Sequence, residues 1–205
     1  MVLIIFLMIL AALILLFFLF LIAFYRDPTR KIPEGRNIVS PADGKIMNIS
    51  ATESNKNSIK KGLFGKIESL TNGIAYKCHI ISIFMSPLDV HVNRSPVPGT
   101  VVSVKHTPGK YYAAFNIKKS ILNEKNEILI KSESIGKIKV IQIAGFLARR
   151  ILCKVKKGDK VLKGQKIGKI VLGSQVTLIL PFKGIKLKIK KGQKVIAGET
   201  ILAEY

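Results

Sequence analysis

The sequence contains no tryptophan, only two cysteines, and only 12 acidic residues against 34 lysines and arginines. Five of its ten phenylalanines lie before residue 26, so few aromatic side chains are left as stacking platforms for nucleic acid. The cysteines, Cys78 and Cys153, lack CxxC spacing, which argues against a zinc site. We therefore expect no metal ion, no nucleic-acid partner, and two cysteines that pack as small apolar groups.

Charged side chains are also absent from the first 25 residues, which are almost all apolar. A helix of that length is about 37 Å long at ~1.5 Å per residue, enough to cross a hydrocarbon core of about 30 Å. A cleaved signal peptide would have a basic start, an apolar run of about 7–15 residues and a small-x-small cleavage site. Because none of these is present, we expect residues 1–25 to be one transmembrane anchor helix.

Basic residues follow this apolar run directly, at Arg26, Arg30, Lys31 and Arg36. By the positive-inside rule, the rest of the chain is expected at the cytoplasmic face of the cell membrane. All charged side chains lie after residue 25, so the soluble part carries the whole net charge of +22. Such a field favours an anionic partner, and in a tethered domain the anionic membrane is the simplest one.

The chain after the anchor is predicted to be a breaker-rich linker (26–37) and a single β domain (38–205). Its apolar segments are β-branched or alternate with polar residues, as strands do. The expected strands are Ile38–Ser40, Gly44–Ile49, Ala75–Met85, Val90–Asn93, Gly99–Val104, Ile128–Lys131, Lys137–Ala144 and Val176–Leu180. A short turn of helix is expected near Ser58–Leu63, and the fold class is all-β.

One internal repeat is visible in the second half of the chain. Lys157–Gly164 recurs, offset by 34 residues, as Lys191–Gly198. The pattern favours two β-hairpins like those of lipoyl and biotinyl domains, and so a barrel-sandwich-like fold. A swinging-arm carrier would need a modifiable lysine in a Met-Lys-Met or Asp-Lys-Ala motif, which is absent. A membrane-tethered binding or adaptor module without catalysis stays open as an alternative function.

Leu172-Gly173-Ser174 lies between the two repeat copies and leads into an apolar strand. Most Gly-Ser pairs are simple turns. A serine hydroxyl can, however, attack the preceding carbonyl where the backbone is open, and Gly173 has no Cβ to block it. The attack gives an ester, elimination across Ser174 breaks the chain, and hydrolysis of the dehydroalanine leaves a pyruvoyl group. That ketone can condense with a substrate amine and serve as an electron sink.

Several segments together resemble the signature segments of phosphatidylserine decarboxylases of the short bacterial and archaeal subtype, in the same order. These segments are Phe24–Pro28, Ser40–Ile46, Phe84–Pro96, Gln142–Ile151 and Leu172–Ser174. The resemblance implies decarboxylation of phosphatidylserine to phosphatidylethanolamine through a Schiff base with a self-generated pyruvoyl group. It implies cleavage at Gly173 and a pyruvoyl cofactor derived from Ser174. The products, a β chain (1–173) and an α chain (174–205), are expected to stay together as a heterodimer.

The resemblance also suggests roles for Asp43 and His91. In longer relatives this aspartate orients a histidine that deprotonates the cleavage serine, and His91 is the candidate for that base or for the acid that protonates the carbanion. Those relatives carry two histidines three residues apart, whereas this chain has Arg94 at the second position. Guanidinium stays protonated and cannot act as a base, so a Ser-His-Asp triad is not carried over intact.

Three arginines are candidate substrate-binding residues. Arg94 offers a fork of donors that suits the lipid phosphate or the substrate carboxylate. Arg149 and Arg150 stand beside an apolar strand, where they either face the headgroup or form a solvated pair.

Overall fold

The computed structural model describes residues 1–53, 71, 73–110, 112, 120, 122–145, 150–171 and 174–205. In these ranges it has a helix, α1 (Val2–Tyr25), and otherwise mainly strands, so the all-β prediction is confirmed. The helix expected near Ser58–Leu63 lies outside the described residues. The strands are β1 (Asn37–Val39), β2 (Gly44–Glu53), β3 (Lys77–Met85), β4 (Val92–Arg94), β5 (Gly99–Thr107), β6 (Lys125–Ser132), β7 (Gly136–Ala144), β8 (Arg150–Cys153), β9 (Lys160–Val161), β10 (Lys166–Val171), β11 (Ser174–Pro181), β12 (Lys186–Leu187), β13 (Lys194–Val195) and β14 (Ile201–Glu204).

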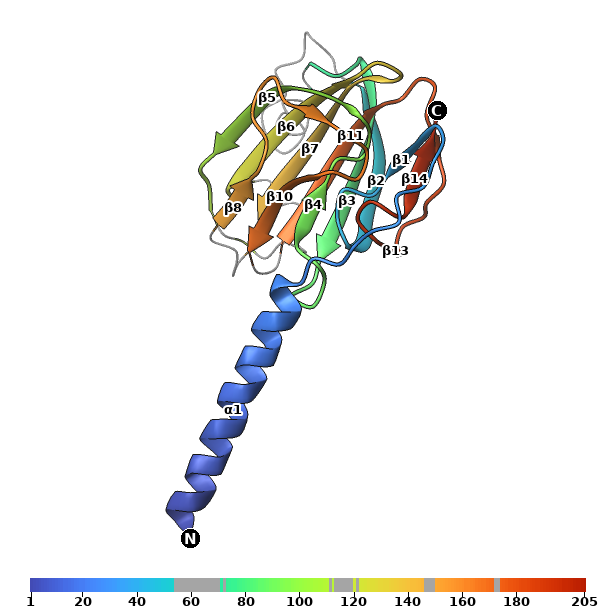
Figure 1. Ribbon diagram of the computed structural model, residues 1–205. Helices are drawn as coiled ribbons and strands as arrows, with labels where there is room; N and C mark the ends of the chain where they lie inside the picture. Colours follow the sequence, from blue (N-terminus) through green and yellow to red (C-terminus); the bar gives the residue numbers. More distant parts are fainter. Residues whose placement is uncertain are drawn as a thin grey trace.

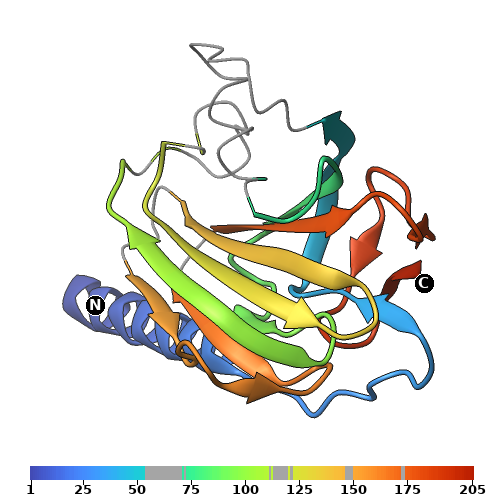
Figure 2. The ribbon, with the colours of Figure 1, turned by 90° about the horizontal axis from the view of Figure 1, so that it is seen from above.

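The strands form an eight-stranded sheet that curls around the main core, in the order β13-β2-β3-β11-β7-β6-β5-β9 (Figure 2). Two three-stranded sheets, β4-β10-β8 and β1-β14-β12, accompany it. Strand β11 lies between β3 and β7 and is antiparallel to both. Each of its residues from Ser174 to Leu180 is buried, as expected for a strand covered on both faces.

Helix α1 projects away from one end of the β domain (Figure 1). Its 24 residues are long and apolar enough to cross a membrane, with a mean hydropathy of 3.5 in the most apolar window. Phe24, near its end, is the buried residue of the helix, whereas most of the preceding side chains are exposed. This exposed apolar surface fits the predicted membrane anchor.

The two copies of the repeat occupy equivalent places in the fold. Val161 pairs in register with Gly99, and Val195 pairs with Gly44. The short strands within one copy do not pair with each other, however: β9 joins the large sheet, whereas β10 joins β4 and β8. Each copy is therefore a crossover between sheets, where the sequence led us to expect a hairpin.

A second repeat, which the sequence analysis missed, completes this symmetry. The Gly164 N–H donates to the Ser95 carbonyl, and the Gly198 N–H donates to the Ser40 carbonyl, both at 2.8 Å. The Ser40 hydroxyl closes a turn on the carbonyl of Ala42, and the Ser95 hydroxyl does the same on the carbonyl two residues later. The signal was the shared pattern Ser-Pro-x-x-Gly at 40–44 and 95–99. The domain is thus built from two similar halves.

The two halves meet at Gly164 and Gly198, beside the linker residue Ile32. Both glycines have a φ of 78°, a conformation that side chains with a Cβ rarely adopt. A Cβ on Gly164 would overlap the Ile32 side chain, and one on Gly198 would come within 3.0 Å of Ile32 Cδ1. Glycine at these positions lets the linker lie directly across the junction.

We expect Gly164→Ala to lower the apparent unfolding temperature more than Gly136→Ala does. Gly136 has the same φ of 78°, but a methyl group placed on it would meet nothing within 4 Å, so its substitution measures the backbone strain alone. That strain costs about 1 kcal/mol, or about 2–4 °C in a chain of this size. Gly164→Ala should lose at least twice as much, measured by the thermal loss of β circular dichroism in detergent. Equal losses in the two variants would contradict the contact with Ile32.

Candidate active site

Ser174 is the first residue of β11, at the end of the large sheet nearest to α1 (Figure 1). It pairs in register with Met85 at the end of β3 and with Ala144 at the end of β7. Its side chain has no exposed surface, and its hydroxyl donates to Met85 Sδ at 3.4 Å. This hydroxyl is therefore shielded from water. Because a thioether sulfur is a weak hydrogen-bond acceptor, the hydroxyl can readily donate to a stronger acceptor instead.

His91 is fully buried and belongs to the segment that connects β3 to β4 in the chain. It lies beside β10, the strand that leads toward Ser174. The Ile170 N–H donates to the His91 carbonyl at 3.2 Å. His91 Nδ1 lies 2.8 Å from the carbonyl oxygen of Asp89. Because a carbonyl only accepts, Nδ1 carries the proton, and Nε2 of the neutral ring keeps its lone pair.

The surroundings of His91 favour this neutral ring. Burial lowers the pKa of His91 to about 4, although the hydrogen bond to Asp89 and its charge oppose the change. The positive charges of Lys169 and Arg26 lower this pKa further. The ring of Phe24 covers the imidazole, with ring centroids 4.5 Å apart and an interplanar angle of 40°. At neutral pH the imidazole is therefore a proton acceptor held against the end of helix α1.

A chain of buried amide side chains runs through the interior to the same sulfur atom. Asn126 Nδ2 donates to Gln142 Oε1 at 2.9 Å, and Gln142 Nε2 donates to Asn93 Oδ1 at 2.8 Å. Asn93 Nδ2 in turn lies 3.7 Å from Met85 Sδ, the atom that also accepts from Ser174. Sequence reasoning missed this chain, although Asn93 and Gln142 lie in the motif segments. This chain of hydrogen bonds holds the Met85 side chain in place, and Met85 Sδ is the atom that the Ser174 hydroxyl contacts.

Asp43 contacts an arginine and a backbone N–H in the described structure. Its carboxylate accepts from Arg30 at 2.8 and 3.0 Å and from the Ala197 N–H at 2.8 Å. Burial raises the pKa of Asp43, while the Ala197 N–H and the Arg30 charge oppose that rise. These contacts hold the linker on the domain. The orientation of a histidine by Asp43 stays a prediction, and the Asp89 carbonyl is the group that fixes the His91 tautomer.

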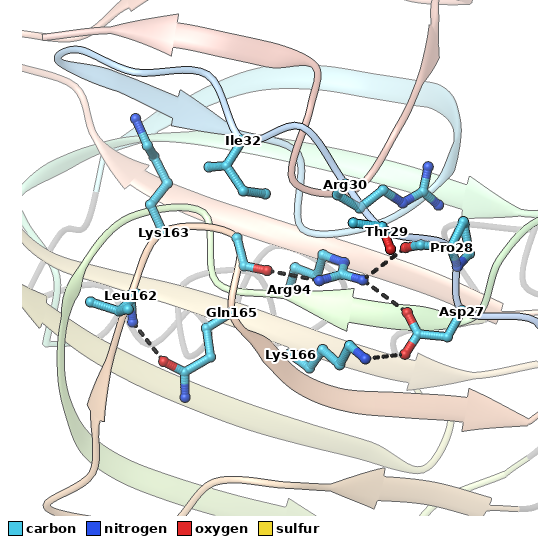
Figure 3. A pocket seen from close by; sticks show the side chains of 11 residues that line it. Asp27, Pro28, Thr29, Arg30, Ile32, Arg94, Leu162, Lys163, Gln165 and Lys166 are labelled. Carbon is cyan, nitrogen blue, oxygen red and sulfur yellow. Dashed lines mark hydrogen bonds and ion pairs between the residues drawn. The ribbon is translucent and has the colours of Figure 1, made fainter.

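Arg94 lines a cavity of about 540 Å³ beneath the linker, together with Asp27, Pro28, Lys166 and other side chains (Figure 3). Its guanidinium donates to Asp27 Oδ1 at 2.8 Å and to the Gly164 carbonyl at 3.1 Å. Lys166 pairs with the other oxygen of Asp27 at 2.5 Å. Lipid binding by Arg94 stays a prediction, because these partners already occupy donors of its fork.

The other predicted residues are only partly described. Arg150 begins β8, is exposed and pairs in register with Val171, whereas Gly173 and Arg149 lie outside the described residues. Cys78 is buried as expected, but Cys153 is exposed, so the prediction that both cysteines pack in the interior was wrong for Cys153. Short β8 lies at the edge of its sheet, which leaves this side chain facing outward. Among the residues described, no three His, Cys, Asp or Glu side chains gather to hold a metal ion.

Comparison with known proteins gives one consistent family. The family profile described as phosphatidylserine decarboxylase matches residues 17–203. A putative archaetidylserine decarboxylase proenzyme of Methanocaldococcus jannaschii is 42% identical over 188 residues, covering 90% of this chain and 89% of that protein. Phosphatidylserine decarboxylase proenzymes of Chlorobium phaeobacteroides and Chlorobaculum tepidum are each 41% identical, over 91% and 96% of this chain and 80% and 82% of their own lengths.

We expect the folded protein to lose stability as the pH falls, through His91. Its pKa is about 4 in the fold and about 6.5 when unfolded. Protons therefore bind the unfolded chain first, and the stability present above pH ~6.5 is lost as the pH falls toward 4. Between pH 7 and 5 this amounts to about 2 kcal/mol. Urea unfolding at both pH values should show a drop smaller by that amount in His91→Gln, and an equal drop in both proteins would contradict it.

Proposed function

The chain belongs to the phosphatidylserine decarboxylase family, and we propose that it removes the serine carboxylate of phosphatidylserine as carbon dioxide, giving phosphatidylethanolamine. The observation that carries this proposal is the family match over residues 17–203, with Ser174 buried at the start of the central strand β11. The alternative of a non-catalytic adaptor module is not favoured, because the relatives compared above are named as decarboxylase proenzymes.

The word proenzyme in those names supports processing of this chain into two pieces, here β (1–173) and α (174–205). Ser174 fits as the new amino terminus, because it is the first residue of a strand that is paired with β3 on one side and β7 on the other. These pairings hold the strand in place after the chain is cut before Ser174. A pyruvoyl group at this position supplies the electrophilic carbonyl that takes up the electrons left behind as carbon dioxide departs. The two pieces stay joined, because β11 and β14 of the α chain pair with β3, β7 and β1 of the β chain.

His91 is the proposed proton-transfer residue for self-cleavage and for turnover. Because the Asp89 carbonyl holds the proton on Nδ1, Nε2 keeps its lone pair and can take the proton of the Ser174 hydroxyl. Once protonated, a buried imidazole with a pKa of about 4 is a strong acid and readily returns the proton. One histidine can thus act first as base and then as acid, without a second histidine at the position of Arg94.

The proposed place of work is the cytoplasmic face of the cell membrane. The reacting headgroup projects only a few ångströms from the bilayer. Strand β11, whose first residue is Ser174, begins at the end of the domain from which α1 departs. The exposed Leu88 lies in the turn after β3, and its carbonyl accepts from Arg26, directly after the helix. Arg150 begins β8, opposite Val171 at the end of β10, and Arg150 and its neighbour in the sequence, Arg149, are proposed headgroup contacts. Asp43 is proposed to act on the site through the linker that it anchors.

We expect Ser174→Ala to abolish both self-cleavage and carbon dioxide release, because no hydroxyl is left to attack the Gly173 carbonyl. The wild-type chain should give two fragments, and mass spectrometry should show the smaller one, residues 174–205, beginning with pyruvoyl. Ser134→Ala, at an exposed turn serine, is the matched control and should be processed normally. An active wild-type preparation that consists of uncleaved chain would refute the proposal.

Deleting residues 1–23 should weaken sedimentation with phosphatidylserine vesicles at least tenfold while leaving self-cleavage within about twofold of the full chain. The deletion removes most of the ~30 Å apolar span but keeps Phe24, which covers His91. Fragment yield after purification in detergent measures cleavage. Phe24→Ala in the full chain is the complementary variant and should slow cleavage while membrane association persists. The reverse pattern would show that the span itself, and not Phe24, supports the site.

A further inference from the structure

Lys169 is a half-buried lysine on β10 that the mechanism above does not use. In the register it lies opposite Val92 on β4 and Leu152 on β8. Its ammonium lies 4.2 Å from the centroid of the Tyr25 ring and 5.4 Å from that of Phe24. These are distances at which the negative face of an aromatic ring attracts a cation. The lysine is thus held against the last turn of the anchor helix.

The position of Tyr25 sets the depth of this ammonium. Tyr25 ends a helix of 24 residues, whose length of about 36 Å exceeds the ~30 Å of hydrocarbon that it has to cross. Tyrosines at such helix ends sit at the level of the lipid headgroups. Lys169 is therefore at headgroup depth, and the ring of Phe24 that it approaches also contacts His91.

The charge of the Lys169 ammonium is not balanced by an ion pair within the described residues. Within the described part of the chain, no carboxylate lies within ion-pair distance of its ammonium, and nearby Asp27 pairs with Arg94 and Lys166 instead. Burial lowers the pKa of Lys169, and the charge of Lys154 lowers it further, although Asp27 opposes them. A partly desolvated cation beside other cations is stabilised when an anion from outside the chain binds to it.

We infer that Lys169 binds the phosphodiester of the substrate headgroup and thereby places the serine moiety against His91 and Ser174. This inference rests on the proposed function. For Lys169, the phosphodiester is a better ligand than the serine carboxylate. A cation on the carboxylate would stabilise the charge that must be lost with carbon dioxide, whereas binding the unreactive phosphodiester helps substrate and transition state alike. Lys169 thus sets affinity, and its loss affects KM.

The test uses full-length, self-processed protein in micelles of a nonionic detergent, which contains no phosphate of its own. Initial rates of carbon dioxide release are measured against the mole fraction of phosphatidylserine. Lys169→Met should raise the apparent KM about tenfold and change kcat less than twofold, and Lys169→Arg should restore most of the affinity. Lys137→Met is the control for lost charge, because Lys137 is exposed in β7 near the end of the strand away from Ala144 and Ser174.

An unchanged KM in Lys169→Met, or a fall in kcat alone, would overturn the inference. Loss of processing in Lys169→Met would also overturn it, because Lys169 would then act in self-cleavage. Phosphatidylethanolamine distinguishes the two anions, since it keeps the phosphodiester and lacks the carboxylate. Its inhibition constant should rise about tenfold in Lys169→Met, and an unchanged constant would assign Lys169 to the carboxylate. A wild-type chain without fragments or carbon dioxide release would instead refute the proposed function.

Discussion

The contact between Phe24 and His91 is the interaction on which the arrangement of the site depends. It places the last turn of an apolar helix on the imidazole that lies beside the strand leading to Ser174. Burial under this ring keeps His91 neutral, and the Asp89 carbonyl holds the proton on Nδ1, so that Nε2 keeps its lone pair. One packing contact therefore couples the position of helix α1 to the protonation state of the proposed base. Desolvation here serves both anchoring and chemistry.

The linker extends this coupling across the domain. Arg30 and Asp27 are tied to Asp43 and Arg94, which belong to the two motif segments of the two halves. The Arg30–Asp43 pair is largely buried, where losing one partner leaves an uncompensated charge. In the other pair Arg94 is buried and Asp27 is exposed. The linker is thus fixed to the domain, and the helix that precedes it leaves the domain at a defined place. Motif residues of this kind carry structure as well as chemistry.

Much of this structure could be predicted from local features of the sequence. An uncharged run of 25 residues is enough to predict the helix, and alternating β-branched segments are enough to predict most of the long strands. Gly173-Ser174 and His91 stand out through their motif segments. The partners of Asp43 and Arg94 could not be predicted, because ion pairs between residues far apart in sequence depend on the finished fold. The crossover of each repeat copy between sheets was missed for the same reason.

The two similar halves of the domain differ at one turn. In the first half the Ser-Pro-x-x-Gly turn carries Asp43 before its glycine, whereas the second half has Pro98 at that place. Proline offers no charge to an arginine, so the linker can bind through Arg30 on one side only. The two similar halves of the domain are thereby made different from each other. A single difference in a duplicated turn is sufficient to distinguish the two halves at the place where the linker leaves α1.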